Sequence, residues 1–144
     1  MRSVQSAAAS GAAPRIVSLD PITDARGTLA AADSDALPFS PVRYFVIHDV
    51  PQEAIRARHA LRQGQELLSC VSGSCTVEVR WQSGHAVHRL AGPATALHLP
   101  PWVWVECREF SGDAVLLVLC SLPYDPLDQI TDFGEFEAGP PARA

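Results

Sequence analysis

Lysine is absent from this chain of 144 residues, and all eleven of its basic residues are arginine. This absence excludes every mechanism that needs a lysine Schiff base or a lysine amine as the base. The formal net charge is −5. A surface that follows nucleic-acid phosphates draws its affinity from clustered cations, so binding to nucleic acid is not expected.

Cysteine is sparse, and its spacing does not include a C-x-x-C pair. The four residues, Cys70, Cys75, Cys107 and Cys120, sit in apolar stretches typical of strands, where free cysteine behaves as a small buried hydrophobe. Buried free thiols and a reducing, cytoplasmic compartment are therefore predicted. The opening run "MRSVQSAAASGAAPR" is too short and too weakly apolar for a signal core or a membrane span, so residues 1–14 are predicted to be a disordered leader and no membrane partner is expected.

Long helical periodicity is also lacking, and what remains is a series of short apolar segments with a period of two. Turn residues such as "SGS", "QSG", "AGP" and "SGD" separate these segments at intervals typical of a sandwich or barrel. The expected strands are 43–50, 66–71, 75–81, 85–90, 94–99, 103–110 and 114–121. The pattern predicts an all-β protein with a single domain over 15–136, a short helix within 125–136, and a flexible tail over 137–144.

The run "IRARHALRQGQELLSCVSGSC" resembles the first half of a metal-binding cupin motif, in which His-x-His is followed by Glu and Gly. In that order the chain offers His59, Leu61, Glu66 and Gly73, and Val105 occupies the place of the later histidine. Two of four ligand positions remain, whereas a non-haem metal usually needs about three protein ligands and an open position. The sequence therefore predicts that no metal and no cofactor is bound.

A narrower resemblance covers residues 20 to 136. The runs "DARGTLAAADSDALPFSPVRYFVI", "RARHAL", "CVSGSCTVEV", "LHLPPWVWVE", "DAVLLVL" and "YDPLDQITDFGEF" occur in an order similar to that of the sugar 3,4-ketoisomerase group of small cupins, which act on TDP-4-keto-6-deoxyglucose. The resemblance implies a metal-free jelly-roll barrel that forms a homodimer, often by exchange of N-terminal strands. In this group the motif R-G-x-H-A-H carries histidines that move a proton between sugar carbons and an arginine that steadies charge, and Arg56 and His59 match it.

The remaining positions depart from that motif. Its glycine is Ala57 here, its second histidine is Leu61, the glutamine that usually follows is Glu66, and the histidine after "PPWVW" is Val105. Ketoisomerisation needs a positioned acid and base, and losing one such group typically costs about 10² to 10⁴ in rate. The aliphatic replacements also enlarge the apolar surface, so the pocket is predicted to be mostly apolar with a few polar anchors.

Three functions are compatible with such a pocket. The first is a cofactor-free cyclase or isomerase that folds an apolar polyketide-type small molecule for intramolecular cyclisation, which needs shape and exclusion of water more than a base. The second is a surviving TDP-4-keto-6-deoxyglucose 3,4-ketoisomerase, and the third is a non-catalytic binding or assembly protein. The catalytic candidates are His59, Glu66 and Arg56. The substrate-binding candidates are Leu61, Trp102, Trp104, Val105, Tyr44 and Tyr124.

Structural roles compete with these assignments. His59 could be a hydrogen-bonded wall residue, Glu66 could pair with Arg56 or Arg62, and the two tryptophans could be core or dimer-contact residues. The segment 15–22, "RIVSLDPI", needs a sheet edge to pair with, which together with the resemblance predicts a homodimer.

Overall fold

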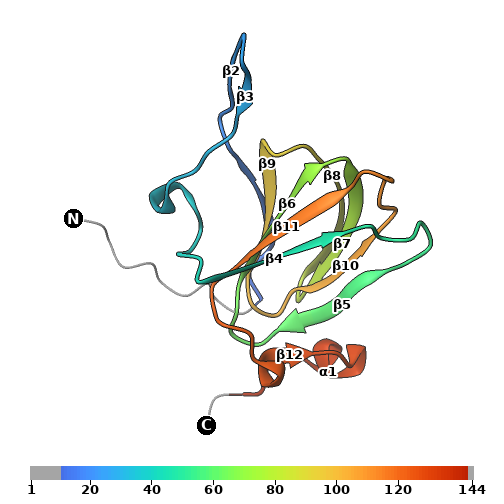
Figure 1. The fold of residues 1–144 in the computed structure, drawn as a ribbon. Coiled ribbons are helices and arrows are strands. Elements are labelled where there is room, and N and C mark those ends of the chain that lie inside the picture. Colours follow the sequence, from blue (N-terminus) through green and yellow to red (C-terminus); the bar gives the residue numbers. More distant parts are fainter. Residues whose placement is uncertain (1–10, 143–144) are drawn as a thin grey trace.

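The structure is a computed structural model that describes residues 11–142. It consists of two antiparallel five-stranded sheets, a two-stranded ribbon and one short C-terminal helix (Figure 1). The predicted all-β class is therefore confirmed. Residues 1–10 of the predicted leader lie outside the described residues.

The first sheet has the strand order β1-β9-β6-β11-β4. Its strands are β1 (Arg15–Ser18), β4 (Arg43–His48), β6 (Glu66–Ser72), β9 (Thr95–Leu99) and β11 (Val115–Cys120). The strand β1 pairs with β9 of the same chain, with Arg15 opposite His98 and Ser18 opposite Thr95. Segment 15–22 was expected to need a sheet edge. For residues 15–18 that edge is β9 of the same chain.

The second sheet has the strand order β12-β5-β10-β7-β8. Its strands are β5 (Arg56–Leu61), β7 (Ser74–Trp81), β8 (Gly84–Ala91), β10 (Trp104–Arg108) and β12 (Gln129–Ile130). The two sheets enclose the largest apolar core, to which both contribute alternate residues, as strand geometry requires. Leu116 and Val118 enter it from β11, and Val77 and Val79 enter it from β7.

The remaining elements lie outside the two sheets. The ribbon is made of β2 (Ile22–Asp24) and β3 (Gly27–Leu29) and stands clear of the barrel at the top of Figure 1. Two single 3₁₀ turns span Ser34–Ala36 and Pro126–Asp128. The helix α1 (Phe133–Ala138) begins after Asp132, whose side chain accepts a hydrogen bond from the Gly134 N–H. The last two residues of α1, Glu137 and Ala138, belong to the segment 137–144 that was predicted to be a tail.

None of the helices in the described part of the chain is long and apolar enough to cross a membrane.

Candidate active site

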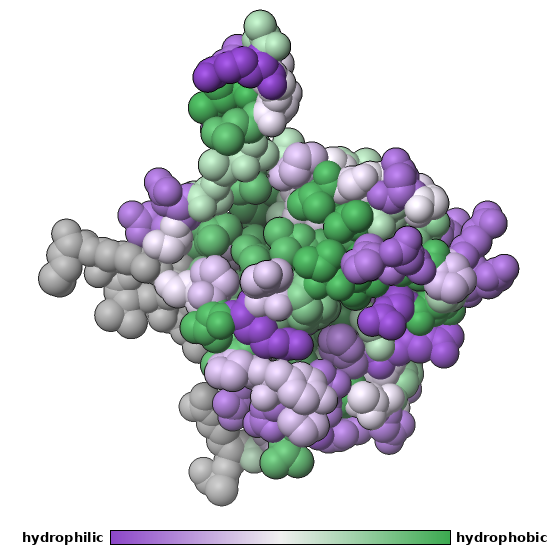
Figure 2. Space-filling view, in the orientation of Figure 1, coloured by the Kyte–Doolittle hydropathy of each residue, from purple (hydrophilic) through white to green (hydrophobic). Residues whose placement is uncertain are grey.

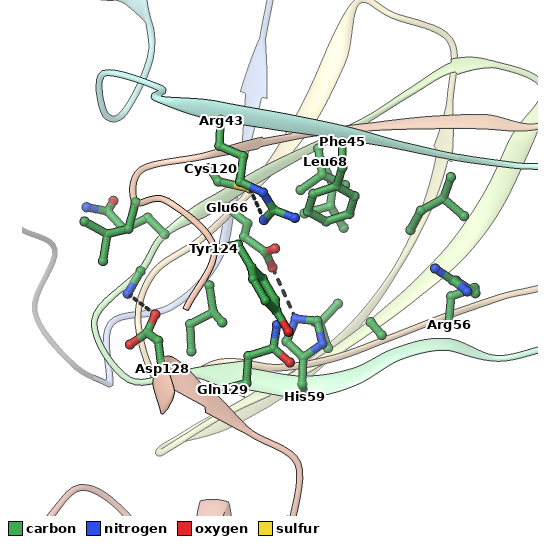
Figure 3. A pocket seen from close by; sticks show the side chains of 18 of the residues that line it. Arg43, Phe45, Arg56, His59, Glu66, Leu68, Cys120, Tyr124, Asp128 and Gln129 are labelled. Carbon is green, nitrogen blue, oxygen red and sulfur yellow. Dashed lines mark hydrogen bonds and ion pairs between the residues drawn. The ribbon is translucent and has the colours of Figure 1, made fainter. Parts of the chain in front are cut away.

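A cavity of about 590 Å³ lies between the two sheets, in the range usual for small-molecule sites. Its inner wall is apolar and includes Phe45, Leu68, Val105 and Val118. Polar side chains gather nearer the C-terminal segment, where Arg43, Glu66, Tyr124, His59 and Gln129 lie together (Figure 3). The cavity therefore joins an apolar interior to a polar mouth.

A β-bulge in β5 directs several side chains of this strand into the cavity. Opposite β10, His59 faces Val105 and Ala57 faces Glu106, so that Arg58 has no partner in the register. Both Ala57 and Arg58 have left-handed backbones, with φ of 75° and 60°, as is common where an extra residue is inserted. As a result Arg56, Ala57 and His59 all line the cavity, although strict alternation would turn neighbours apart.

His59 faces Glu66 across the cavity wall. The imidazole Nε2 lies 3.5 Å from a Glu66 carboxylate oxygen, and the two side chains are only 17% and 9% exposed (Figure 3). The Nε2 atom itself is buried and makes no hydrogen bond to any described residue. A buried polar atom without a hydrogen bond is costly, and the nearby Glu66 carboxylate favours a proton on this nitrogen.

Two arginines give the cavity positive charge. The Arg43 guanidinium lies between two rings, 4.9 Å from the centroid of Phe45 and 5.3 Å from that of Tyr124, and its Nη1 donates to the Cys120 thiol at 3.7 Å. Arg56 lies further along β5, away from this group (Figure 3). Among the described residues no carboxylate forms an ion pair with either arginine, so both cations are free to meet an anionic ligand.

The wall near the mouth is fixed by Asp128. Its carboxylate accepts the Gln63 and Gly64 N–H groups at 2.8 and 3.0 Å, and its carbonyl accepts the Arg62 N–H at 2.8 Å. A Cβ atom at Gly64 would lie 2.9 Å from the same carboxylate, so glycine permits this approach. The turn after β5 is thereby tied to the C-terminal segment that carries Tyr124 and Gln129.

The structure places six of the nine predicted site residues on the cavity. They are Arg56, His59, Leu61, Glu66, Val105 and Tyr124. Glu66 does not pair with Arg56 or Arg62, since Arg62 pairs with Glu135 at 3.0 Å.

Trp102, Trp104 and Tyr44 do not line the cavity. The two tryptophans are buried in a separate apolar cluster with Ala60 and the helix α1. The ring centroids of Trp104 and Phe133 are 5.1 Å apart. Both tryptophans are therefore core residues, the alternative role considered for them. Tyr44 is 68% exposed on the outer side of β4.

Several residues of the cavity were not predicted. Arg43 shares the inward face of β4 with Phe45, and this alternation was a usable signal. Gln65 precedes β6, and Gln129 comes from the distant segment that forms β12. Nothing in the local sequence pattern indicates that Gln129 approaches His59.

All four cysteines are free and buried, as predicted. Two of them, Cys107 and Cys120, line the cavity. Burial raises the pKa of the Cys120 thiol to about 11 and raises the pKa of Cys107 further. Both remain protonated at neutral pH and are poor nucleophiles.

The donor set is suited to proton transfer. In the described part of the chain no group of three or more His, Cys, Asp or Glu side chains is arranged to hold a metal ion. An imidazole beside a carboxylate can remove and return a proton, and a guanidinium can stabilise an oxyanion. This combination is suited to abstraction of a proton next to a carbonyl group.

Known proteins resemble most of the chain. The family model described as FdtA: WxcM-like, C-terminal, matches residues 12–139. The TDP-4-oxo-6-deoxy-alpha-D-glucose-3,4-oxoisomerase of Aneurinibacillus thermoaerophilus is 33% identical over 126 residues, which are 85% of this chain and 89% of that enzyme.

Solved structures of similar enzymes have the same fold. A mutant of the 3,4-ketoisomerase QdtA from Thermoanaerobacterium thermosaccharolyticum, in complex with TDP-4-keto-6-deoxyglucose, superposes with a TM-score of 0.83 at 25% identity, over 87% of this chain and 91% of that one. The TDP-quinovose 3,4-ketoisomerase WlaRB from Campylobacter jejuni gives a TM-score of 0.82 at 31% identity, over 88% of this chain and 98% of that one.

Proposed function

This chain belongs to the family described as FdtA: WxcM-like, C-terminal, and from this premise we propose that it moves the ketone of a nucleoside-diphosphate-linked 4-keto-6-deoxyhexose from C4 to C3 without a cofactor. At the coarser level the chain is a cupin enzyme similar to sugar ketoisomerases. The comparisons give no support to the predicted cyclisation of a polyketide-type substrate. They support the sugar alternative instead.

The geometry also weakens the cyclisation prediction. A templating cavity would need apolar walls at its entrance, and the tryptophans expected there pack against α1 instead. The mouth carries Arg43, Asp125, Asp128 and Gln129. An arginine suits a phosphate, and carboxylate and amide groups suit sugar hydroxyls, better than they suit a hydrocarbon chain.

The imidazole of His59, which lines the cavity with its Nε2 3.5 Å from the Glu66 carboxylate, is the observation that carries the proposal. In the proposed reaction neutral His59 removes the proton from C3, and the electrons of that bond form an enediolate as the C4 carbonyl oxygen gains negative charge. The protonated imidazole then gives a proton to C4, and the hydroxyl proton passes from the C3 oxygen to the C4 oxygen. The ketone is left at C3 with no net gain or loss of protons.

The two unpaired arginines fit the charges of such a substrate. Arg43, held between Phe45 and Tyr124 in the group that contains His59, is assigned to the negative charge of the enediolate. Arg56, further along β5, is assigned to the diphosphate, because guanidinium groups bind phosphate oxygens well.

The test is turnover of TDP-4-keto-6-deoxyglucose in deuterium oxide, followed by NMR. The wild-type chain should form a 3-keto product, with deuterium at C4 in the turnovers in which the proton on His59 exchanges with solvent. His59→Asn should lower kcat by roughly 10² to 10⁴, the usual cost of a lost general base. The control is His48→Asn, which changes a 61% exposed side chain on the outer side of β4 and should leave kcat unchanged.

No turnover and no exchange of the C3 proton by the folded wild-type chain would contradict the proposal. Deuterium incorporation without movement of the ketone would indicate an epimerase instead. Turnover that His59→Asn removes would exclude cyclisation, in which a wall residue should matter far less.

A further inference from the structure

Glu66 is the carboxylate that lies beside His59 in the cavity wall. Glu66 begins β6, and its ion pair with His59 is the one ion pair that it makes among the described residues. Its carboxylate accepts no hydrogen bond from them either. The side chain is only 9% exposed, at the border between the polar group of the mouth and the apolar residues Leu68, Val105 and Val118.

This environment makes the two side chains complementary. A carboxylate away from water is costly unless it is paired, and the same is true of an imidazolium. The imidazolium exists only after His59 has taken the substrate proton, so Glu66 interacts with it more strongly in the transition state than in the resting site. An interaction that strengthens in the transition state raises kcat more than it lowers KM.

Compared with the ketoisomerase motif, this sequence lacks one imidazole and has gained a carboxylate on β6. The ketoisomerase motif that the chain resembles has a second histidine at position 61 and a glutamine at position 66. Here these positions hold Leu61 and Glu66, and both line the cavity. The aliphatic Leu61 cannot handle a proton, whereas Glu66 can.

We propose that Glu66 replaces the missing imidazole as the positioning and charge-stabilising partner of His59, so that this chain works with a carboxylate–imidazole pair. The inference rests on the proposed function. In the forward step the imidazole takes the C3 proton at its other ring nitrogen, Nδ1, while the Glu66 carboxylate, 3.5 Å from Nε2, stabilises the resulting imidazolium. In the return step the same proton, or one exchanged with solvent, goes to C4, and Glu66 ends as it began.

The first experiment replaces Glu66 by the amide of the same size. Glu66→Gln should lower kcat by roughly 10² with a much smaller change in KM, and it should change the shape of the kcat profile against pH. The matched control is Glu109→Gln, the same chemical change at a side chain that is 66% exposed and does not line the cavity. Wild-type kcat and an unchanged pH profile in folded Glu66→Gln would overturn the inference.

A second variant tests replacement directly. Leu61→His combined with Glu66→Gln restores the imidazole and the amide of the related motif. The kcat of this double variant should be at least about tenfold higher than that of Glu66→Gln alone. A residue with a merely structural role would not be rescued by a new imidazole at position 61. A folded double variant no faster than Glu66→Gln would count against the inference.

The third measurement needs no substrate. Side-chain ¹⁵N NMR of His59 reports the state of Nε2, and Glu66→Gln should move this resonance while Glu109→Gln leaves it in place. An unmoved resonance would overturn the pairing of the two side chains whatever the enzyme's substrate is. If Glu66→Gln moves the resonance but the wild-type chain does not turn over the sugar, the pairing of the two side chains stands. The proposed function, and with it the catalytic role of Glu66, would then be overturned.

Discussion

His98 is a buried titratable residue outside the cavity. It is 5% exposed on β9, where its Nε2 donates to the Gln65 side-chain oxygen at 2.8 Å and its ring lies near Phe39. Its Nδ1 is buried without a partner among the described residues. Burial, with a smaller contribution from the charge of Arg15, lowers the pKa of His98 to about 4.

This lowered pKa predicts a loss of stability in mild acid. Above pH 6.5 His98 is neutral in both the folded and unfolded states, so its stabilising effect is fully present. Below pH 6.5 the unfolded chain binds the proton first, and the free energy of unfolding should fall by about 3 kcal/mol as the pH approaches 4.

The measurement compares urea unfolding of the wild type and His98→Gln at pH 7.5 and 4.5. The variant keeps an amide that can reach Gln65 but has no titration in this range. Carboxylates contribute equally to both proteins, so the wild type should lose about 2 to 3 kcal/mol more than the variant. Equal losses would mean that His98 opens to solvent before it titrates.

At the scale of the strand, β5 carries strain in its bulge. Ala57 has φ of 75°, a conformation that costs a residue with a Cβ atom about 1 to 2 kcal/mol. The related ketoisomerase motif has glycine at this position, which adopts it without that cost. Glycine also gains entropy in the unfolded chain, by about 0.4 to 1 kcal/mol.

Ala57→Gly should therefore increase the free energy of unfolding by up to about 1.6 kcal/mol, the largest difference between these two effects. The measurement is the urea midpoint at constant m value. Ala60→Gly is the control from the same strand. Ala60 has no left-handed φ and is buried against the tryptophan cluster, so its replacement should destabilise the protein. A destabilised Ala57→Gly would show that the bulge is not strained.

Most of the strands could be predicted from the sequence because their apolar residues alternate or run continuously. The expected strand 85–90 corresponds to β8 (Gly84–Ala91), and 75–81 corresponds to β7 (Ser74–Trp81). The pattern did not mark β5 as a separate strand, because its bulge breaks the period of two and its arginines reach solvent or the cavity. It also missed β12, which has two residues and pairs with β5 only through tertiary contacts.

Alternation explains the misplaced aromatic residues. Val103, Val105 and Cys107 belong to the core between the sheets, so Trp104 must face outward, where α1 covers it. The same rule places Phe45 inside and Tyr44 outside on β4. Nearness to the motif in sequence suggested a pocket role, whereas the direction of each side chain decides it.

At the scale of the whole molecule, the cavity depends on contacts that no local pattern reveals. Asp128 closes the turn before β6 from more than sixty positions away, and Gln129 reaches the cavity because β12 pairs with Leu61 and Ala60 of β5. His59 and Glu66 stand on different sheets and meet because the turn between them is short. Their residue types could be predicted as important, but their pairing could not.

The β2–β3 ribbon is the part of the described chain that most needs a partner. It is a separate two-stranded sheet, and an isolated ribbon of this kind is marginally stable in water. Ile22 and Leu29 stand opposite each other and are 65% and 60% exposed. Figure 2 shows hydrophobic residues on this projection, clear of the rest of the molecule.

These exposed residues support the prediction that the chain forms a homodimer in which the ribbon packs on a second copy. Light scattering after gel filtration at micromolar concentration should give twice the chain mass of 15.5 kDa. Leu29→Asp would place a charge in the apolar contact and should weaken the dimer by roughly tenfold or more, since burying an unpaired charge costs several kcal/mol. The control is Val87→Asp on β8, a 52% exposed residue of the other sheet, which should leave the mass unchanged. A wild-type chain that elutes as a monomer would contradict the prediction, and a dimer insensitive to Leu29→Asp would place its interface elsewhere than on the ribbon.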